Sequence, residues 1–180
     1  MGLCIAGVCN EFDTNLPFTA LLWPMAEITL LLGANQGEPH ATFARATTLI
    51  HDRIGPVLAT SRDHWTPPWG FQDDRIFLNR ALLVAAQMDP QQVMQALLQI
   101  ESELGRVRPT GGGYASRIID IDILFVGEQV IETPGLSVPH PRVHQRAFAL
   151  GPAADIVPGL VHPLLHRPIL ELLNNVLQQP

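Results

Sequence analysis

The sequence predicts an α+β fold, namely a ferredoxin-like βαββαβ core in which helices cover an antiparallel sheet. Short runs of consecutive apolar residues, typical of buried strands, alternate with two longer segments of helical periodicity, and these segments follow one another in the order β-α-β-β-α-β. The chain has 180 residues, of which 47% are hydrophobic and 16% charged. That length and composition are sufficient for one domain with its own core.

The first predicted strand spans residues 28–32 and consists only of apolar residues and one threonine. A helical pattern follows over residues 38–53. Pro39 suits the first turn of this helix, and Gly55 suits the position just beyond its end. These signals predict the first strand and the first helix of the core.

Residues 56–70 predict a strand that ends in a proline-rich loop, and residues 77–87 predict the next strand. The clearest helix of the sequence spans residues 89–105. Asp89 is a good N-cap for it, and Gly105 is a good terminator. The last strand of the core is predicted within residues 116–127.

The remaining segments predict additions to this core. Residues 128–137 suggest a small hairpin or loop, residues 138–156 a loop that runs into a helix, and residues 167–179 a short terminal helix. Residues 1–24 differ from the rest because they show no clear helix or strand period. We expect them to be a dispensable N-terminal extension to a domain that spans residues 25–180, with Met25 as the natural start.

The charged residues narrow the class of function. The net charge of −6 argues against a general nucleic-acid surface. All eleven basic residues are arginines, so a P-loop lysine and a Schiff-base lysine are excluded. Arginine is then the permanent cation that remains for phosphate groups, and its bidentate fork suits that role.

The cysteines and the apolar runs predict a cytoplasmic protein with no membrane partner. Cys4 and Cys9 are too few for a disulfide scaffold, and without nearby partners they are a weak metal signal. No apolar run reaches the length of a membrane span. The first basic residue is Arg45, so the positive region that begins a signal peptide is missing.

Two aspartates interrupt the last predicted strand, "SRIIDIDILFVG". Side chains alternate across a strand, so Asp120 and Asp122 share one face and start about 6.6 Å apart. Two like charges so close on a partly buried face repel each other, and a divalent cation such as Mg²⁺ would reverse that penalty. A solvent-facing pair, or an ion pair with Arg117, is the structural alternative, and this motif alone leaves both open.

The neighbouring segments supply arginines, which suit phosphate charge, and aromatic side chains, which suit a flat ring. Together the segments resemble those of the 6-hydroxymethyl-7,8-dihydropterin pyrophosphokinase family, from residue 27 to about residue 175. The matching segments, in the family's order and spacing, are "LLLGANQG", "TPPWG", "FLN", "ESELGR", "SRIIDIDILF" and "VPHPRVHQRAF".

This resemblance implies transfer of a pyrophosphoryl group from ATP to the hydroxymethyl group of a reduced pterin, with AMP as the second product. It implies that Asp120 and Asp122 hold two Mg²⁺ ions, and that Arg106 and Arg117 stabilise charge during transfer. The residues implied to bind the pterin are Thr66, Pro67, Pro68, Phe77, Asn79, Tyr114 and Phe148. Those implied to bind ATP are Glu101, Arg106, Arg108, Arg117, Ile123, His140 and Arg146.

The family also has a loop that closes over both substrates, which here would carry Arg108 and Tyr114. Three positions depart from the family pattern: Ala34 stands where serine is usual, Leu98 where a polar residue often contacts ATP, and Tyr114 where tryptophan is common. We expect these changes to affect affinity and loop dynamics more than the reaction. We expect a monomer or a weak dimer.

Three other interpretations compete with this one, and the segment "VPHPRVHQRAF" and the negative net charge disfavour the first and the second of them, respectively. A nucleotidyltransferase also pairs a glycine-containing turn with two aspartates, but it would release pyrophosphate rather than AMP. A non-enzymatic ferredoxin-like module that binds RNA would need exposed aromatic residues on its strands and a basic face. An inactive relative of the family is the third, because of the three departures.

Overall fold

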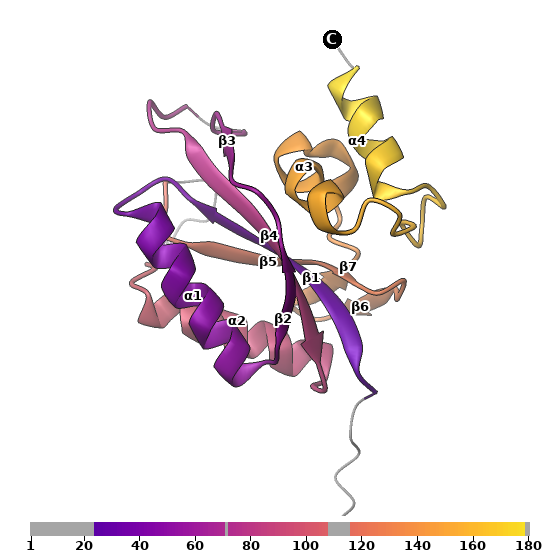
Figure 1. Ribbon diagram of the computed structural model, residues 1–180, viewed down its shortest axis with the longest axis horizontal. Coiled ribbons are helices and arrows are strands. Elements are labelled where there is room, and N and C mark those ends of the chain that lie inside the picture. Colours follow the sequence, from indigo (N-terminus) through magenta and orange to yellow (C-terminus); the bar gives the residue numbers. More distant parts are fainter. Residues whose placement is uncertain (1–23, 71, 108–115, 179–180) are drawn as a thin grey trace, which may run out of the picture.

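Strand β1 (Ala26–Ala34) lies at the centre of an antiparallel sheet in the computed structural model (Figure 1). Its neighbours are β4 (Phe77–Ala86) and β5 (Asp120–Val126), and β2 (Val57–Thr60) extends the sheet beyond β4, which gives the order β2-β4-β1-β5. Each of these pairs is antiparallel. The predicted ferredoxin-like arrangement of the sheet is confirmed.

The structure describes residues 24–70, 72–107 and 116–178. The expected extension over residues 1–24 falls, except for its last residue, outside these ranges, and so do Arg108 and Tyr114. Within the described ranges, no helix is both long enough and apolar enough to cross a membrane.

The edge of the sheet beside β4 consists of two short strands rather than the single predicted one. After β2 the chain leaves the sheet, and it pairs with β4 again in β3 (His64–Thr66). Ser61 lies at the break. Its backbone N–H donates to the carbonyl of Ala81 at 3.0 Å, and its Oγ accepts the N–H of Ala81 at 2.9 Å. The hydroxyl of Ser61 thus accepts the N–H that a backbone carbonyl would accept in a continuous strand.

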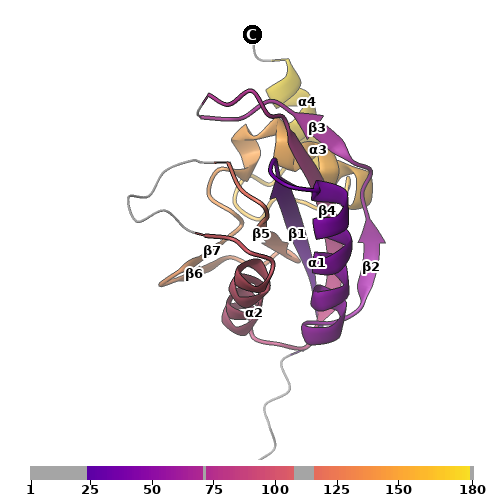
Figure 2. The same ribbon diagram turned by 90° about the vertical axis from the view of Figure 1, so that its left-hand side faces the viewer.

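Two helices, α1 (Pro39–Arg53) and α2 (Pro90–Glu103), cover one face of the sheet, as predicted (Figure 2). Asp89 caps α2 by accepting the backbone N–H of Gln91 at 2.8 Å, while the side chain of Gln92 accepts the N–H of Asp89. Such a cap satisfies backbone donors that have no partner within the helix. The largest buried side chains on this face come from both layers and include Phe43, Ile50, Leu97, Ile100, Leu30 and Leu32.

The C-terminal additions cover the opposite face of the sheet, so helices lie on both faces (Figure 1). They comprise α3 (Ala147–Ile156) and α4 (Ile169–Leu177), which are preceded by a hairpin of β6 (Ile131–Thr133) and β7 (Leu136–Val138). A second apolar cluster forms beneath the two helices. The predicted hairpin and both C-terminal helices are therefore confirmed.

A register shift in β5 supplies part of this second cluster. The pairing of β5 with β1 skips Leu124, so Leu124 and Phe125 both belong to the cluster under α3 and α4. Ile123 and Val126 on either side belong to the main core. An extra residue in one strand breaks strict alternation in this way. Side chains of β5 therefore pack into both apolar clusters. The first half of the strand keeps strict alternation, which orients Asp120 away from the main core.

Gly55 generates the first prediction, because it ends α1 with a positive φ of 155° and lies against β4. A Cβ atom at this position would sit 2.0 Å from the carbonyl oxygen of Ala85. We expect Gly55→Ala to lower the free energy of unfolding by more than about 2 kcal/mol, because backbone has to move to relieve the clash.

Gly159 is the matched control, since no heavy atom lies within 4 Å of the position that a Cβ atom would take there. Gly159→Ala should change stability by less than about 0.5 kcal/mol. Urea denaturation of both variants provides the comparison. Equal stability of the two variants would contradict the assigned contact.

Candidate active site

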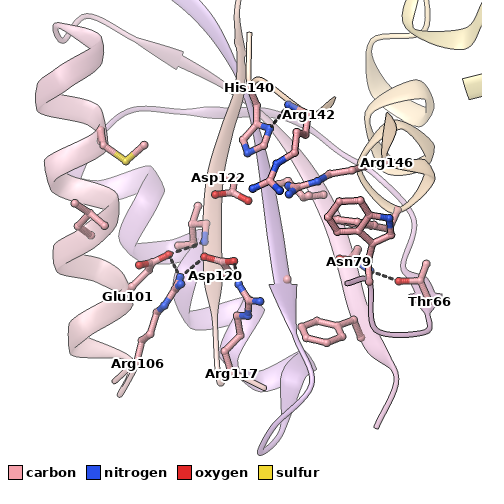
Figure 3. A pocket seen from close by; sticks show the side chains of 18 of the residues that line it. Thr66, Asn79, Glu101, Arg106, Arg117, Asp120, Asp122, His140, Arg142 and Arg146 are labelled. Atoms are coloured by element: carbon pink, nitrogen blue, oxygen red, sulfur yellow. Dashed lines mark hydrogen bonds and ion pairs between the residues drawn. The ribbon is translucent and has the colours of Figure 1, made fainter. Parts of the chain in front are cut away.

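A cavity of about 560 Å³ opens at one end of the sheet, on the face that α3 covers (Figure 3). Strands β1, β4 and β5 contribute its floor, α2 contributes one wall, and the start of α3 with the loop before it contributes another. The acidic side chains, with Arg106 and Arg117, lie towards β5 and α2, while the aromatic side chains lie towards β3, β4 and α3, where Arg146 packs on them. The cavity therefore has a charged end and an aromatic end.

Asp120 and Asp122 leave β5 on the same face and point into the cavity, as the sequence predicts (Figure 3). They lie opposite Gly33 and Leu31 of β1 in the sheet register. Ile121, between them, points into the main core on the other face. Strand alternation thus gives β5 a core face and a carboxylate face.

Two arginines hold Asp120 from opposite sides. Nη1 of Arg106 contacts Oδ1 of Asp120, and Nη1 of Arg117 contacts Oδ2. The ion pair between Arg117 and Asp120 that the sequence left open is therefore present. It leaves Asp122 to other partners, so it does not account for the motif as a whole.

Glu101 positions one of these arginines from below. Its side chain is 2% exposed, and its Oε1 accepts hydrogen bonds from Nη1 of Arg106 at 2.5 Å and from the backbone N–H of Ile121 at 2.7 Å. A buried carboxylate needs such partners to offset its lost hydration. Glu101 thus links α2 to β5 and presents Arg106 to the cavity.

Asp122 has an unusual electrostatic environment. Burial, and secondly the charge of Asp120, raise the pKa of its carboxyl from 3.8 to about 7, although the positive charge of Arg146 acts in the other direction. The charged form is therefore costly unless a cation arrives. Its position at the cavity floor makes such a cation accessible.

His140 lies above Asp122 and is neutral near pH 7 (Figure 3). Burial lowers the pKa of His140 to about 4, and the charges of Arg146 and Arg142 contribute in the same direction. Its Nδ1 accepts the backbone N–H of Arg142 at 3.2 Å. A neutral imidazole that accepts at Nδ1 carries its proton on Nε2, so His140 can donate a hydrogen bond from Nε2.

The aromatic end of the cavity presents flat surfaces and one polar edge. Phe77 from β4 and Phe148 from α3 both line it. Asn79, which is 3% exposed, donates from Nδ2 to Oγ1 of Thr66 at 2.8 Å, so its amide orientation is held. Pro67 lines the same end. Aromatic faces with a fixed amide suit a planar, hydrogen-bonding ring.

Two predicted residues lie elsewhere, although both are within the described ranges. Pro68 is outside the set of residues that line this cavity. Ile123 is 2% exposed in the main core, and it borders a neighbouring shallow hollow that shares Asp122 and His140 with the cavity. The remaining predicted residues that the structure describes are brought together around the one cavity.

Four other lining residues, Trp69, Met94, Leu98 and Arg142, were not among the residues predicted to bind a substrate, although Leu98 departs from the family pattern. The ring centroid of Trp69 lies 6.2 Å from that of Phe148, and the guanidinium carbon of Arg146 lies 4.8 Å from the Trp69 centroid. Arg142 contacts the same indole at 5.9 Å. Met94 and Leu98 form an apolar wall from α2. Their helical spacing was a sequence signal, since residues four apart share a helix face.

The donors present at β5 suit a metal that arrives with phosphate. Among the described residues, no group of three or more His, Cys, Asp or Glu side chains could hold a metal ion. Mg²⁺ characteristically uses one or two carboxylates and completes its shell with water and phosphate oxygens. Asp120 and Asp122 therefore fit such an ion.

Comparison with known proteins gives one consistent result. The family model described as 7,8-dihydro-6-hydroxymethylpterin-pyrophosphokinase (HPPK) matches residues 29–158. A 2-amino-4-hydroxy-6-hydroxymethyldihydropteridine pyrophosphokinase of Porphyromonas gingivalis is 38% identical over 148 residues, which are 81% of this chain and 100% of that protein. The Bacillus subtilis protein of the same name is 37% identical over 71% of this chain and 75% of its own length.

Solved structures agree on the fold. A Plasmodium falciparum HPPK-DHPS structure superimposes with a TM-score of 0.70 at 17% sequence identity, over 87% of this chain and 45% of that one. A second structure of that protein, with pteroate, gives a TM-score of 0.67 over 84% of this chain and 42% of that one. The chain thus spans less than half the length of these structural relatives, and the likeness concerns the fold.

The raised pKa of Asp122 generates the second prediction. Between about pH 4 and pH 7 the folded chain keeps a proton on this carboxyl that the unfolded chain has released. The free energy of unfolding in the absence of metal therefore falls as pH rises through this window. Asp122→Asn should remove that fall, so the variant should be more stable than the wild type at pH 8 and similar to it at pH 4.

Urea denaturation at several pH values, with EDTA present, is the measurement. Asp52→Asn, at an exposed position on α1, is the control and should follow the wild-type profile. An Asp122→Asn profile parallel to that of the wild type would show that Asp122 carries no such penalty.

Proposed function

The chain belongs to the 7,8-dihydro-6-hydroxymethylpterin-pyrophosphokinase family, and from this membership we propose the roles of its residues in the family reaction. It is an ATP-dependent diphosphokinase of folate biosynthesis. It transfers a pyrophosphoryl group from ATP to 6-hydroxymethyl-7,8-dihydropterin and leaves AMP. The observation that best supports the proposed roles is that one cavity joins an aromatic end to a cluster of arginines and aspartates.

The aromatic end is the proposed pterin site. Phe77 and Phe148 enclose the flat ring, and Asn79 reads its polar edge together with Thr66 and the backbone of Pro67 and Pro68. Support comes from the hydrogen bond that fixes the Asn79 amide and from the cavity position of both phenylalanines. A ring held there projects its hydroxymethyl group towards β5, where the charged end begins.

The charged end is the proposed site of transfer. We assign Asp120 and Asp122 to two Mg²⁺ ions, which when bound would screen the ATP phosphates and polarise the acceptor hydroxyl. A Mg²⁺ ion at Asp120 would compete with the two arginines for its carboxylate oxygens. Arg106 and Arg117, which hold Asp120 in this structure, are then available to the phosphate oxygens. Their proposed role is to stabilise the charge that moves to the leaving AMP.

His140 and Arg146 are the proposed ATP contacts on the opposite side of Asp122. A neutral His140 donates from Nε2 to an oxygen of ATP, and Arg146 supplies a permanent positive charge. Glu101 contributes by holding Arg106. Ile123 is a proposed contact of the nucleoside of ATP, and its position at the border of the shallow hollow beside His140 supports this role. Arg108 and Tyr114 stay proposed ligands of ATP and the pterin on the strength of the sequence.

Three further proposals concern the whole protein. The domain spans residues 25–180, which contain the full family match over residues 29–158. The enzyme works in the cytoplasm. It is a monomer or a weak dimer, which sedimentation at micromolar concentration would test.

The experiment that tests the function determines which phosphorus atoms of ATP are transferred to the pterin. The protein is incubated with Mg²⁺, the reduced pterin alcohol, and ATP labelled at either the α or the γ position. The γ label should move to the pterin, and the α label should stay in AMP. Transfer of the α label with release of pyrophosphate would identify a nucleotidyltransferase instead.

The proposed charge-stabilising role of Arg106 gives the third prediction. Arg106→Ala should lower kcat by a factor on the order of 10² to 10³, because a contact made chiefly in the transition state is lost. The dissociation constant of the pterin should change much less. Stopped-flow turnover and pterin binding by fluorescence are the two measurements.

Arg53→Ala is the matched control, since it removes an arginine whose ion pair with Glu103 lies outside the cavity lining. Its kcat should stay within about twofold of the wild-type value. If the pterin affinity of Arg106→Ala fell as far as its rate, Arg106 would instead be a ground-state binding residue.

A further inference from the structure

A cluster of polar contacts joins α3 to the edge of the sheet beside the aromatic end of the cavity. Oδ2 of Asp155 lies 2.8 Å from Nε2 of His64, and its Oδ1 accepts a hydrogen bond from Nη2 of Arg62 at 2.8 Å. The backbone N–H of Arg62 also donates to Oδ2 at 3.2 Å. An ionised carboxylate only accepts hydrogen bonds, so His64 is the donor in its contact. One helix residue thus holds two residues at the start of β3.

Gly151 brings the helix and the strand unusually close at the same place. A Cβ atom on Gly151 would lie 3.2 Å from Nδ1 and 3.3 Å from Cε1 of the His64 ring. Such distances are tighter than most side-chain contacts, so a glycine at this position lets the imidazole pack directly on the helix backbone. The seating of α3 on β3 therefore depends on packing as well as on the polar contacts.

The spacing of residues on α3 connects this cluster to the cavity. Phe148, Gly151 and Asp155 are three and four residues apart, which places them on one face of the helix. On the strand side, His64 and Thr66 are two residues apart and share one face of β3. Figures 1 and 2 show α3 beside β3 and β4. The same helix face that carries Phe148 is thus fastened to the strand that carries Thr66.

His64 also lies directly behind the polar edge of the pterin site. It is the register partner of Asn79 on β4, and its backbone carbonyl is 3.5 Å from Nδ2 of that amide. Neither His64 nor Asp155 is among the residues that line the cavity. They can therefore affect ligand binding only by positioning α3 and β3, which carry residues that line the cavity.

We propose that the contact of Asp155 with His64 sets the separation between the two walls of the pterin site, Phe148 on α3 and the residues of β3 and β4. Asp155 is then a positioning residue that determines pterin affinity without touching the pterin. This inference rests on the proposed function, because it takes the aromatic end of the cavity to be the pterin site.

The test measures two ligands on each variant. Asp155→Ala should raise the dissociation constant and the KM of the pterin by about tenfold, the scale of a lost hydrogen bond to a charged group. Asp155→Asn, which keeps the size and one acceptor oxygen, should have a smaller effect in the same direction. The dissociation constant of a non-hydrolysable ATP analogue with Mg²⁺ should change by less than about twofold, because its proposed contacts lie on α2 and β5, on the segments next to them, and on the segment before α3.

Two further variants keep the result interpretable. Glu171→Ala, on α4, removes an exposed ion pair with Arg167, which precedes that helix, and should leave both affinities unchanged. Gly151→Ala keeps every polar group but pushes α3 away from His64, so it should reproduce the selective loss of pterin affinity even if Asp155→Ala does not fold.

The outcomes separate this inference from the function on which it rests. Wild-type pterin affinity in Asp155→Ala, or in both Asp155→Asn and Gly151→Ala, would overturn the positioning role. An equal loss of affinity for both ligands would also overturn it, because it would indicate a general structural contribution. Failure of the wild-type protein to bind the pterin would instead contradict the proposed function.

Discussion

Burial of a carboxylate beside a second carboxylate on the same strand face is the constraint around which the active end of this protein is built. Asp120 and Asp122 point into the same cavity, and Glu101 adds a third acid close by. The protein compensates Asp120 with Arg106 and Arg117, and it places Arg146 beside Asp122. The compensation is incomplete, since burial and the charge of Asp120 keep the pKa of Asp122 near 7. An incompletely compensated acid is a site prepared for a cation.

The fold supplies this arrangement by using the two faces of the sheet for different purposes. The face under α1 and α2 carries the main core, which fixes β1, β4 and β5 relative to one another. The other face is apolar only where α3 and α4 cover it, and it becomes polar where β5 carries its aspartates. The register shift at Leu124 marks the change between these two parts. The packing of the apolar face can thus hold the sheet in place while the other face carries electrostatically unfavourable charges.

Much of this architecture could be predicted from the sequence because its signals are local. The Asp89 cap, the terminating glycines and the period of the helices depend on residues a few positions apart, and the structure confirms them. The shared face of Asp120 and Asp122 follows from strand alternation alone. The break in the edge strand could not be predicted from the sequence. It depends on the hydrogen bond that Oγ of Ser61 accepts from the backbone of β4, which forms only when β4 lies beside it. The same holds for Glu101, whose link to Arg106 and to the backbone of β5 requires α2 to be packed in place.

The central claim is that Asp122 is held ready for a metal by an unfavourable charge, and carboxyl ¹³C NMR tests it most directly. In protein labelled at aspartate, with the resonance assigned through Asp122→Asn, the metal-free titration should have its midpoint near pH 7. With Mg²⁺ and a non-hydrolysable ATP analogue, the midpoint should fall below about pH 5, because the ion stabilises the carboxylate. A midpoint near the ordinary value without metal, or one that Mg²⁺ and the analogue do not move, would contradict the account.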